Sequence, residues 1–109
     1  MKYEIKITEK AEEDIRGIYN YIVTELLAPK TAANLLNKLE KSISELDSMP
    51  SRFRKYGSEL WQSRGLRIMP VDNFAVFYIP NKTTKTVTII RVMYAGRDIE
   101  KQLDSKSLV

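Results

Sequence analysis

Basic and aromatic residues are interleaved between residues 51 and 64, where neither helical nor strand periodicity is visible. The basic residues are Arg52, Arg54, Lys55 and Arg64, and the aromatic residues are Phe53, Tyr56 and Trp61. Such a mixture can hold phosphates and stack bases, so the four cations are candidates for binding a nucleic acid or another target. The alternative is a solvated loop whose aromatic side chains pack against the core.

Two further arginines, Arg67 and Arg91, interrupt runs of residues that otherwise have the pattern of β-strands. A guanidinium is costly to bury in an apolar strand, so each arginine needs a partner or a ligand. Arg91 can pair with Asp72 or Asp98 across the sheet. Arg67 has few acidic neighbours in the sequence and is therefore the better functional candidate of the two.

The chain has 109 residues and contains neither Cys nor His. This composition excludes a thiol nucleophile, a disulfide framework, His acid–base catalysis and the usual zinc sites, and no metal or cofactor is expected. No stretch approaches the roughly 20 apolar residues of a membrane span, and the chain does not open on an apolar signal core, so we expect a cytoplasmic protein. The length predicts one domain over residues 1–109, with a frayed tail at about 104–109.

Charge is distributed unevenly along the chain. Residues 1–50 hold 7 Lys/Arg and 9 Asp/Glu, whereas residues 51–109 hold 11 Lys/Arg and 5 Asp/Glu. The basic second half suggests an acidic partner, such as a nucleic acid, a ribosome surface or an acidic inhibitor protein. The alternative is a soluble basic surface with no such partner.

The spacing of apolar residues predicts a strand over residues 3–7, followed by two helices. Thr8 is a candidate N-cap for the first helix, whose apolar stripe runs from Ala11 to Leu26. Pro29 suits the first position of the second helix, which is expected to extend to about residue 48. The connection between the helices is only a few residues long, so they must form an antiparallel hairpin.

Three strands are expected in the second half, at about residues 66–70, 74–80 and 86–94. Asp72 and Asn73 make a plausible tight turn between the first two strands, and a short helix is expected from Asp98 to Leu103. The element order β-α-α-β-β-β, with that short C-terminal helix, predicts an α+β two-layer domain. In this domain the helical hairpin packs on a mainly antiparallel sheet.

In the last strand, period two places four side chains on one face: Val87, Ile89, Arg91 and Met93. One face of this strand must cover the helical hairpin, and the other face, if exposed, would be an apolar surface of the kind that binds partners. The strand exit can bring four candidate residues to one end of the sheet: Arg67, Arg91, Tyr94 and Arg97. Strict alternation still points Tyr94 away from Arg91 unless the strand bulges there.

Four segments, in this order, resemble the RelE/ParE superfamily of toxins from bacterial type II toxin–antitoxin modules, also described as plasmid stabilisation or addiction-module proteins. The segments are ITEKAEEDIRGIYNYI, PKTAANLLNKLEKSISELDSMP, GLRIMPVDNFAVFYI and IIRVMYAGRDIEKQL. The resemblance covers about residues 3–103. It implies the fold already derived, a cognate antitoxin that forms a hetero-oligomer with the chain, and growth inhibition when the toxin is free. We expect this antitoxin to cover the sheet edge and the apolar grooves beside the hairpin, and to place acidic residues against residues 51–109.

The resemblance implies one of two activities. RelE-like members are metal-independent, ribosome-dependent endonucleases of mRNA, in which cations stabilise charge at the phosphate and a Tyr or Lys can transfer protons. ParE-like members poison DNA gyrase. If the chain is a nuclease, its candidate catalytic residues are Arg67, Arg91, Tyr94 and Arg97.

Individual positions divide between the two branches. Arg67 and Arg97 match cationic positions of nuclease members, and Tyr94 lies near a functional Tyr of some members. Phe74 stands where several nuclease members carry Arg, and the stretches GLRIMPVDNFAVFY and YAGRDIE look closer to ParE-like members. The resemblance therefore favours a ParE-like gyrase poison and leaves open whether the chain is an enzyme. The alternatives are a RelE-like endonuclease and a non-toxic interaction module of the same fold.

Overall fold

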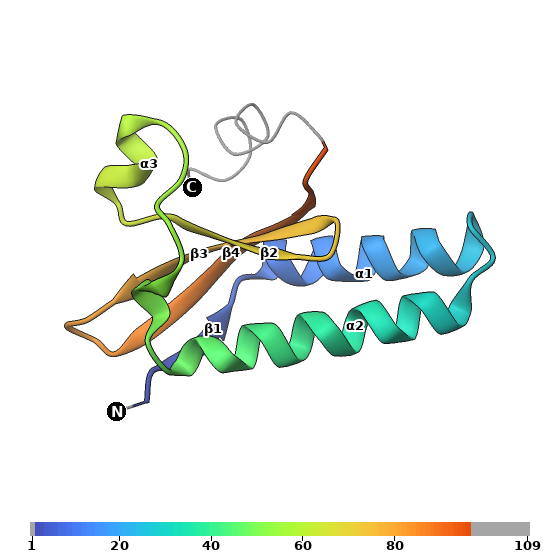
Figure 1. Ribbon diagram of the computed structural model, residues 1–109, viewed down its shortest axis with the longest axis horizontal. Coiled ribbons are helices and arrows are strands. Elements are labelled where there is room, and N and C mark those ends of the chain that lie inside the picture. Colours follow the sequence, from blue (N-terminus) through green and yellow to red (C-terminus); the bar gives the residue numbers. More distant parts are fainter. Residues whose placement is uncertain (1, 97–109) are drawn as a thin grey trace.

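The computed structural model describes residues 2–96, whose arrangement is drawn in Figure 1. In chain order the elements are β1 (Glu4–Ile7), α1 (Glu9–Thr24), α2 (Pro29–Ser44), the 3₁₀ turns η1 (Glu45–Asp47) and η2 (Pro50–Arg52), α3 (Glu59–Ser63), β2 (Arg67–Val71), β3 (Phe74–Asn81) and β4 (Thr86–Tyr94). Arg97, the short C-terminal helix predicted after it and the tail lie outside the described residues.

Helices α1 and α2 begin where the sequence predicts them. The Thr8 hydroxyl caps α1 by accepting a hydrogen bond from the Ala11 N–H at 3.1 Å, and Pro29 occupies the first turn of α2. The link between the helices turns at Leu27, whose φ of 52° lies in the left-handed region. The two helices run antiparallel as a hairpin (Figure 1), as predicted.

The four strands form one sheet in the order β1-β4-β3-β2. Strand β1 pairs with β4 in parallel, and the other two pairs are antiparallel, so the predicted α+β fold with a mainly antiparallel sheet is confirmed. Asp72 and Asn73 make the predicted tight turn between β2 and β3, with Asp72 at a φ of 54°. No helix among residues 2–96 is long and apolar enough to cross a membrane.

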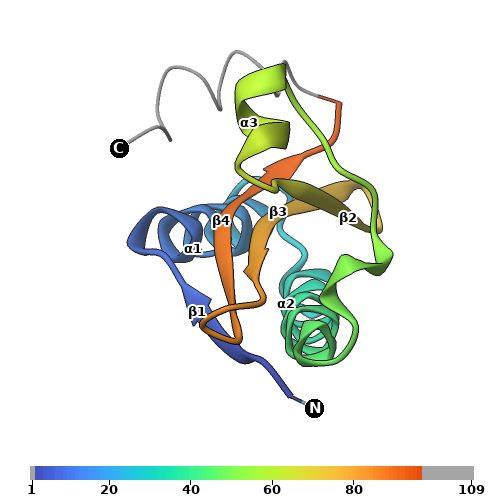
Figure 2. The same cartoon turned by 90° about the vertical axis from the view of Figure 1, so that its left-hand side faces the viewer.

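Both faces of the sheet are covered, at least in part. The hairpin packs on one face through a core that includes Leu39, Ile43 and Tyr78. On the other face Trp61 of α3 and the adjacent Leu66 pack against Ala75, Phe77 and Met93. Figure 2 shows α3 on the far side of the strands from α2.

Helix α3 corrects two sequence-based expectations. Residues 51–64 are not a continuous irregular loop, and the second face of the sheet is not an open apolar surface. Helix α3 has only five residues, too few to show helical periodicity. Its local signal is Ser58, whose hydroxyl accepts a hydrogen bond from the Trp61 N–H.

A bulge in β4 changes which side chains share a face. Phe77 lies opposite Arg91 and Tyr78 lies opposite Ile89, so Ile90 is the extra residue on β4. Ile89 therefore contributes to the core under the hairpin, whereas Met93 contributes to the core under α3. The prediction that Val87, Ile89, Arg91 and Met93 share one face is wrong.

Candidate functional site

Arg91 forms a buried ion pair with Asp14 of α1. Its Nε donates to Asp14 Oδ2 at 2.7 Å, and its Nη2 donates to Asp14 Oδ1 at 3.0 Å. The two side chains are 7% and 14% exposed. This two-point geometry is the strongest form of a guanidinium–carboxylate contact, and it fixes the guanidinium plane against α1.

The same carboxylate also completes the edge of β4. Strand β1 pairs with β4 only as far as Ile89, and beyond that residue the backbone of β4 has no strand neighbour on that side. The Thr8 hydroxyl donates to the Ile90 carbonyl at 3.2 Å, and Asp14 Oδ2 accepts from the Val92 N–H at 3.0 Å. Thr8 and Asp14 therefore provide hydrogen-bond partners for two backbone groups of β4 that have no partner on a neighbouring strand.

The predicted pairing of Arg91 with Asp72 is wrong. Asp72 instead accepts from Lys38 Nζ of α2 at 3.2 Å, at the exposed turn between β2 and β3. The other predicted partner, Asp98, lies outside the described residues. A partner on α1 lies 77 positions away in the sequence, where strand alternation gives no information about it.

Arg67 lies at the other side of the sheet, beside the loop that follows α2. Its Nη1 donates to the Phe53 carbonyl at 2.6 Å, and among the described residues its Nε is buried without a hydrogen-bond partner. Tyr78 lies opposite Arg67 in the register, and its hydroxyl donates to the Pro50 carbonyl at 2.6 Å. Burial raises the pKa of Tyr78 to about 12, although the positive charges of Arg67 and Arg52 act in the opposite direction.

The structure does not bring the candidate catalytic residues together. Arg67 is opposite Tyr78, on the hairpin side of the sheet, whereas Arg91 is opposite Phe77, on the α3 side. Tyr94 lies at the end of β4, half exposed, with its ring in edge contact with Phe74 at a centroid distance of 5.8 Å. Tyr94 points away from Arg91, as strict alternation predicts, and Arg97 lies outside the described residues.

The basic residues between 51 and 64 do lie on the surface, and we call residues 52–64 the basic segment. Arg52, Arg54 and Arg64 each lie over an aromatic ring, at 5.1, 5.3 and 5.8 Å from the ring centres of Phe53, Tyr56 and Trp61. The rings themselves are half buried or buried against the core, as the alternative interpretation predicts. The aromatic side chains therefore support exposed guanidinium groups and do not form a free stacking platform.

The basic segment runs beside the outer edge of β2. The Ile68 N–H donates to the Arg54 carbonyl at 3.1 Å, and the Tyr56 N–H donates to the Leu66 carbonyl at 3.0 Å. Lys55 and Arg67 face each other in an isolated bridge. Between residues 51 and 71 there are five cations and a single acidic residue, Glu59, so this edge of the domain favours an acidic or polyanionic partner.

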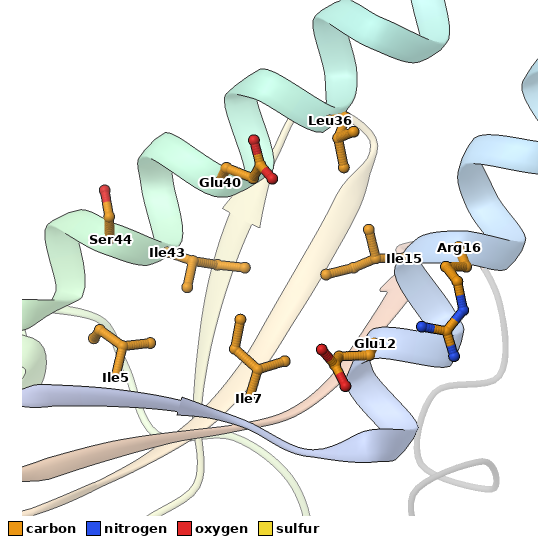
Figure 3. A pocket seen from close by; sticks show the side chains of 9 residues that line it. All are labelled: Ile5, Ile7, Glu12, Ile15, Arg16, Leu36, Glu40, Ile43 and Ser44. Carbon is orange, nitrogen blue, oxygen red and sulfur yellow. The ribbon is translucent and has the colours of Figure 1, made fainter.

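A second candidate binding surface is an apolar groove beside the hairpin, between β1, α1 and α2. Its volume is about 480 Å³. Figure 3 shows its aliphatic side chains converging from the three elements: Ile5, Ile7, Ile15, Leu36 and Ile43. Ile7 is 42% exposed. Leu36 belongs to the apolar stripe of α2 predicted from the sequence, and Ile7 lies on β1, an edge strand of the sheet.

Residues 2–96 contain no group of three or more Asp and Glu side chains placed to hold a metal ion. Within this part of the chain, the geometry supports binding through a basic segment and an apolar groove. The two surfaces differ in chemistry and lie beside different edge strands of the sheet: the groove lies beside β1, and the basic segment lies beside β2.

The chain belongs to the family described as ParE toxin of the type II toxin–antitoxin system parDE, whose model matches residues 5–99. The comparison with curated protein sequences gave no match. The RelE/ParE resemblance seen in the sequence is therefore confirmed at the level of the family.

Solved structures of this superfamily share the fold. A chromosomal ParDE toxin–antitoxin system from P. aeruginosa is 21% identical with a TM-score of 0.68, and the match covers 85% of this chain and 96% of that chain. The RelBE2 toxin–antitoxin complex of Mycobacterium tuberculosis is 20% identical with a TM-score of 0.61, over 86% and 99%. A mutant of E. coli toxin RelE in the free state is 14% identical with a TM-score of 0.65, over 94% and 93%.

Proposed function

We propose that this chain is a growth-inhibiting toxin that acts in the bacterial cytoplasm by poisoning DNA gyrase, and that a cognate antitoxin neutralises it in a hetero-oligomer. The observation that carries the choice of target is the separation of the candidate catalytic cations. Arg91 forms an ion pair with Asp14, and in the strand register Arg67 lies on the opposite face of the sheet. The match to the ParE toxin family points the same way.

A ribonuclease of this class needs cations that converge on one phosphate. Preorganised donors stabilise the charge of the transition state only when they lie within hydrogen-bond distance of the same oxygen atoms. In the described residues, the Arg67 guanidinium donates to the Phe53 carbonyl beside β2, whereas the Arg91 guanidinium is paired with Asp14 at β4, with β3 between the two strands. Tyr94 is in ring contact with Phe74. A gyrase poison needs only a binding surface, which this arrangement permits.

A RelE-like mRNA endonuclease is the second candidate, and the basic segment favours it. Its exposed guanidinium groups could hold the backbone of an RNA. In this alternative, catalysis would depend on Arg67 and the basic segment, and Arg91 would contribute through folding. The activity would still require the ribosome as partner, as the resemblance implies.

The antitoxin is proposed to cover the groove between β1, α1 and α2 and to extend acidic residues onto the basic second half. Five aliphatic side chains line the groove, and Ile7 is 42% exposed, so a partner that covers the groove removes apolar surface from water. The basic segment supplies the complementary charge, which raises the association rate and specificity more than the affinity.

Growth tests check the toxin proposal directly. Expressed alone, the chain should arrest growth, and co-expression with the protein encoded beside its gene should restore it. Normal growth at a confirmed high level of soluble protein would contradict the proposal and favour a non-toxic interaction module of the same fold.

Two purified assays separate the targets. The chain is added to gyrase with supercoiled DNA, and separately to translating ribosomes with a defined mRNA. We expect trapped gyrase–DNA breaks and intact mRNA. Codon-dependent cleavage of the mRNA would establish the endonuclease instead, provided that Arg67→Ala abolishes it and Lys82→Ala, an exposed lysine in the β3–β4 turn, does not.

A further inference from the structure

Three charged side chains form the rim of the apolar groove. Glu12 and Arg16 lie one turn apart on α1, and Glu40 lies on α2 across the groove (Figure 3). All three are exposed, and among residues 2–96 none of them takes part in an ion pair. The charges that surround this apolar surface are therefore available to a partner.

The rim has a chemistry of its own, different from that of the rest of the partner-binding surface. Two carboxylates and one guanidinium give it a net negative charge, whereas the basic segment carries four cations and one carboxylate. A partner with uniformly acidic residues would fit the basic segment and would be repelled by Glu12 and Glu40. The groove therefore requires a second, chemically different stretch of partner.

A second copy of this chain fits the groove less well than a different partner, because two Glu and one Arg on each rim would leave one carboxylate of each copy without a counter-charge. In a two-fold contact the same surface meets itself, so the net negative rim would be brought against its own copy. An aliphatic segment with flanking charges of opposite sign to the rim satisfies both the apolar lining and the polar margin. Such a segment belongs to a different protein, and the antitoxin is the partner that the proposed function supplies.

We infer, on the basis of the proposed function, that Glu12, Arg16 and Glu40 determine which antitoxin this toxin accepts. The antitoxin segment places aliphatic side chains against Ile7 and its neighbours. It carries a Lys or Arg that lies toward Glu12 and Glu40, and an Asp or Glu that lies toward Arg16. Like charges at these positions would exclude the antitoxins of related modules, because unpaired or repelling charges at a margin oppose a wrong partner.

The test measures affinity between the purified chain and the product of the neighbouring gene. Arg16→Glu and Glu40→Lys should each weaken the complex by roughly tenfold or more. Lys30→Glu, a charge reversal of an exposed residue near the other end of α2, is the matched control and should leave the affinity unchanged. Thermal unfolding of each variant confirms that the fold is retained, and the neutral variants Arg16→Gln and Glu40→Gln should show the same direction with a smaller effect.

Growth provides a second measurement that separates this inference from the proposed function. The Arg16→Glu toxin should arrest growth and escape the natural antitoxin, and an antitoxin with its matching acidic residue changed to Lys should neutralise it again. If both variants bind as tightly as Lys30→Glu, the inference is wrong while the toxin proposal stands. If the unmodified chain neither arrests growth nor binds the neighbouring product, the proposed function fails and the inference fails with it.

Discussion

Asp14 and Arg91 are 77 positions apart in the sequence, yet their two-point ion pair joins the first helix to the last strand. The Asp14 carboxylate also accepts the Val92 N–H, so one side chain holds both the guanidinium and the free backbone edge of β4. A residue that the sequence offers as catalytic therefore has a structural task. This changes how any variant of Arg91 must be interpreted.

Replacing Arg91 by Ala should lower the free energy of unfolding by about 3–5 kcal/mol, because it leaves the Asp14 carboxylate buried without its counter-charge. Urea unfolding at pH 7 measures this loss. Lys10→Ala removes one partner of an exposed pair with Glu13 and should change the stability by no more than about 0.5 kcal/mol.

The double variant Asp14→Leu/Arg91→Met should recover only part of the stability lost in Arg91→Ala. Removing both charges abolishes the unpaired carboxylate, but the Val92 N–H then has no acceptor. Full stability in Arg91→Ala together with lost toxicity would instead support a direct functional role for this guanidinium.

Replacing Leu27 by Gly should stabilise the protein by roughly 0.5–1 kcal/mol, because a non-glycine residue at positive φ is strained and Gly relieves that strain at some entropic cost. The Ala28 N–H donates to the Ile22 carbonyl at 3.1 Å around this residue, which is the hydrogen bond of a helix end that favours Gly. Thermal or urea unfolding measures the gain. Ala33→Gly, at an exposed interior position of α2, is the control and should cost about 1 kcal/mol. A loss of stability in Leu27→Gly would show that the Leu27 side chain contributes more than its backbone costs.

The stabilisation of the folded protein by the Tyr78 hydroxyl should disappear at high pH. Tyr78→Phe removes the hydrogen bond to the Pro50 carbonyl and should cost about 1 kcal/mol at pH 8. The folded pKa is about 12 and the ordinary value is 10, so between pH 10 and 12 the unfolded chain releases this proton while the folded chain keeps it. The wild-type protein then loses about 1.4 kcal/mol per pH unit that the variant does not lose. Urea unfolding at pH 8 and pH 11 should show the difference vanish or reverse, and an equal difference at both pH values would contradict the assignment.

Association with the antitoxin should slow clearly as salt concentration rises. The basic segment holds four cations on the surface, and salt screens their attraction for an acidic partner. Stopped-flow measurements at low and high ionic strength test this, and Arg54→Ala should reduce the salt dependence. Lys82→Ala, which lies outside the basic segment, serves as the control. An association rate that does not change with salt would remove the electrostatic argument.

The sequence by itself determined the helical hairpin and the four strands of this protein. Apolar periodicity, the Thr8 cap and Pro29 are local signals, so the predicted hairpin matches α1 and α2. The three strands of the second half and the turn at Asp72 were predicted within a residue or so for the same reason. From those elements and their order, the α+β architecture followed.

Only the tertiary structure decided which side chains meet. The bulge at Ile90 moves Met93 to the face opposite Ile89. This shift of the two-residue period is not visible in the sequence, because both faces of β4 are largely apolar. Helix α3 is too short to show its own period, and Asp14 reaches Arg91 only after α1 folds along the edge of β4. The exposed cations of the basic segment could be predicted from the sequence, because a charged side chain on the surface does not depend on a contact with a distant element. The side chains that line the groove and the separation of Arg67 from Arg91 were not visible, because both depend on contacts between elements that lie far apart along the chain.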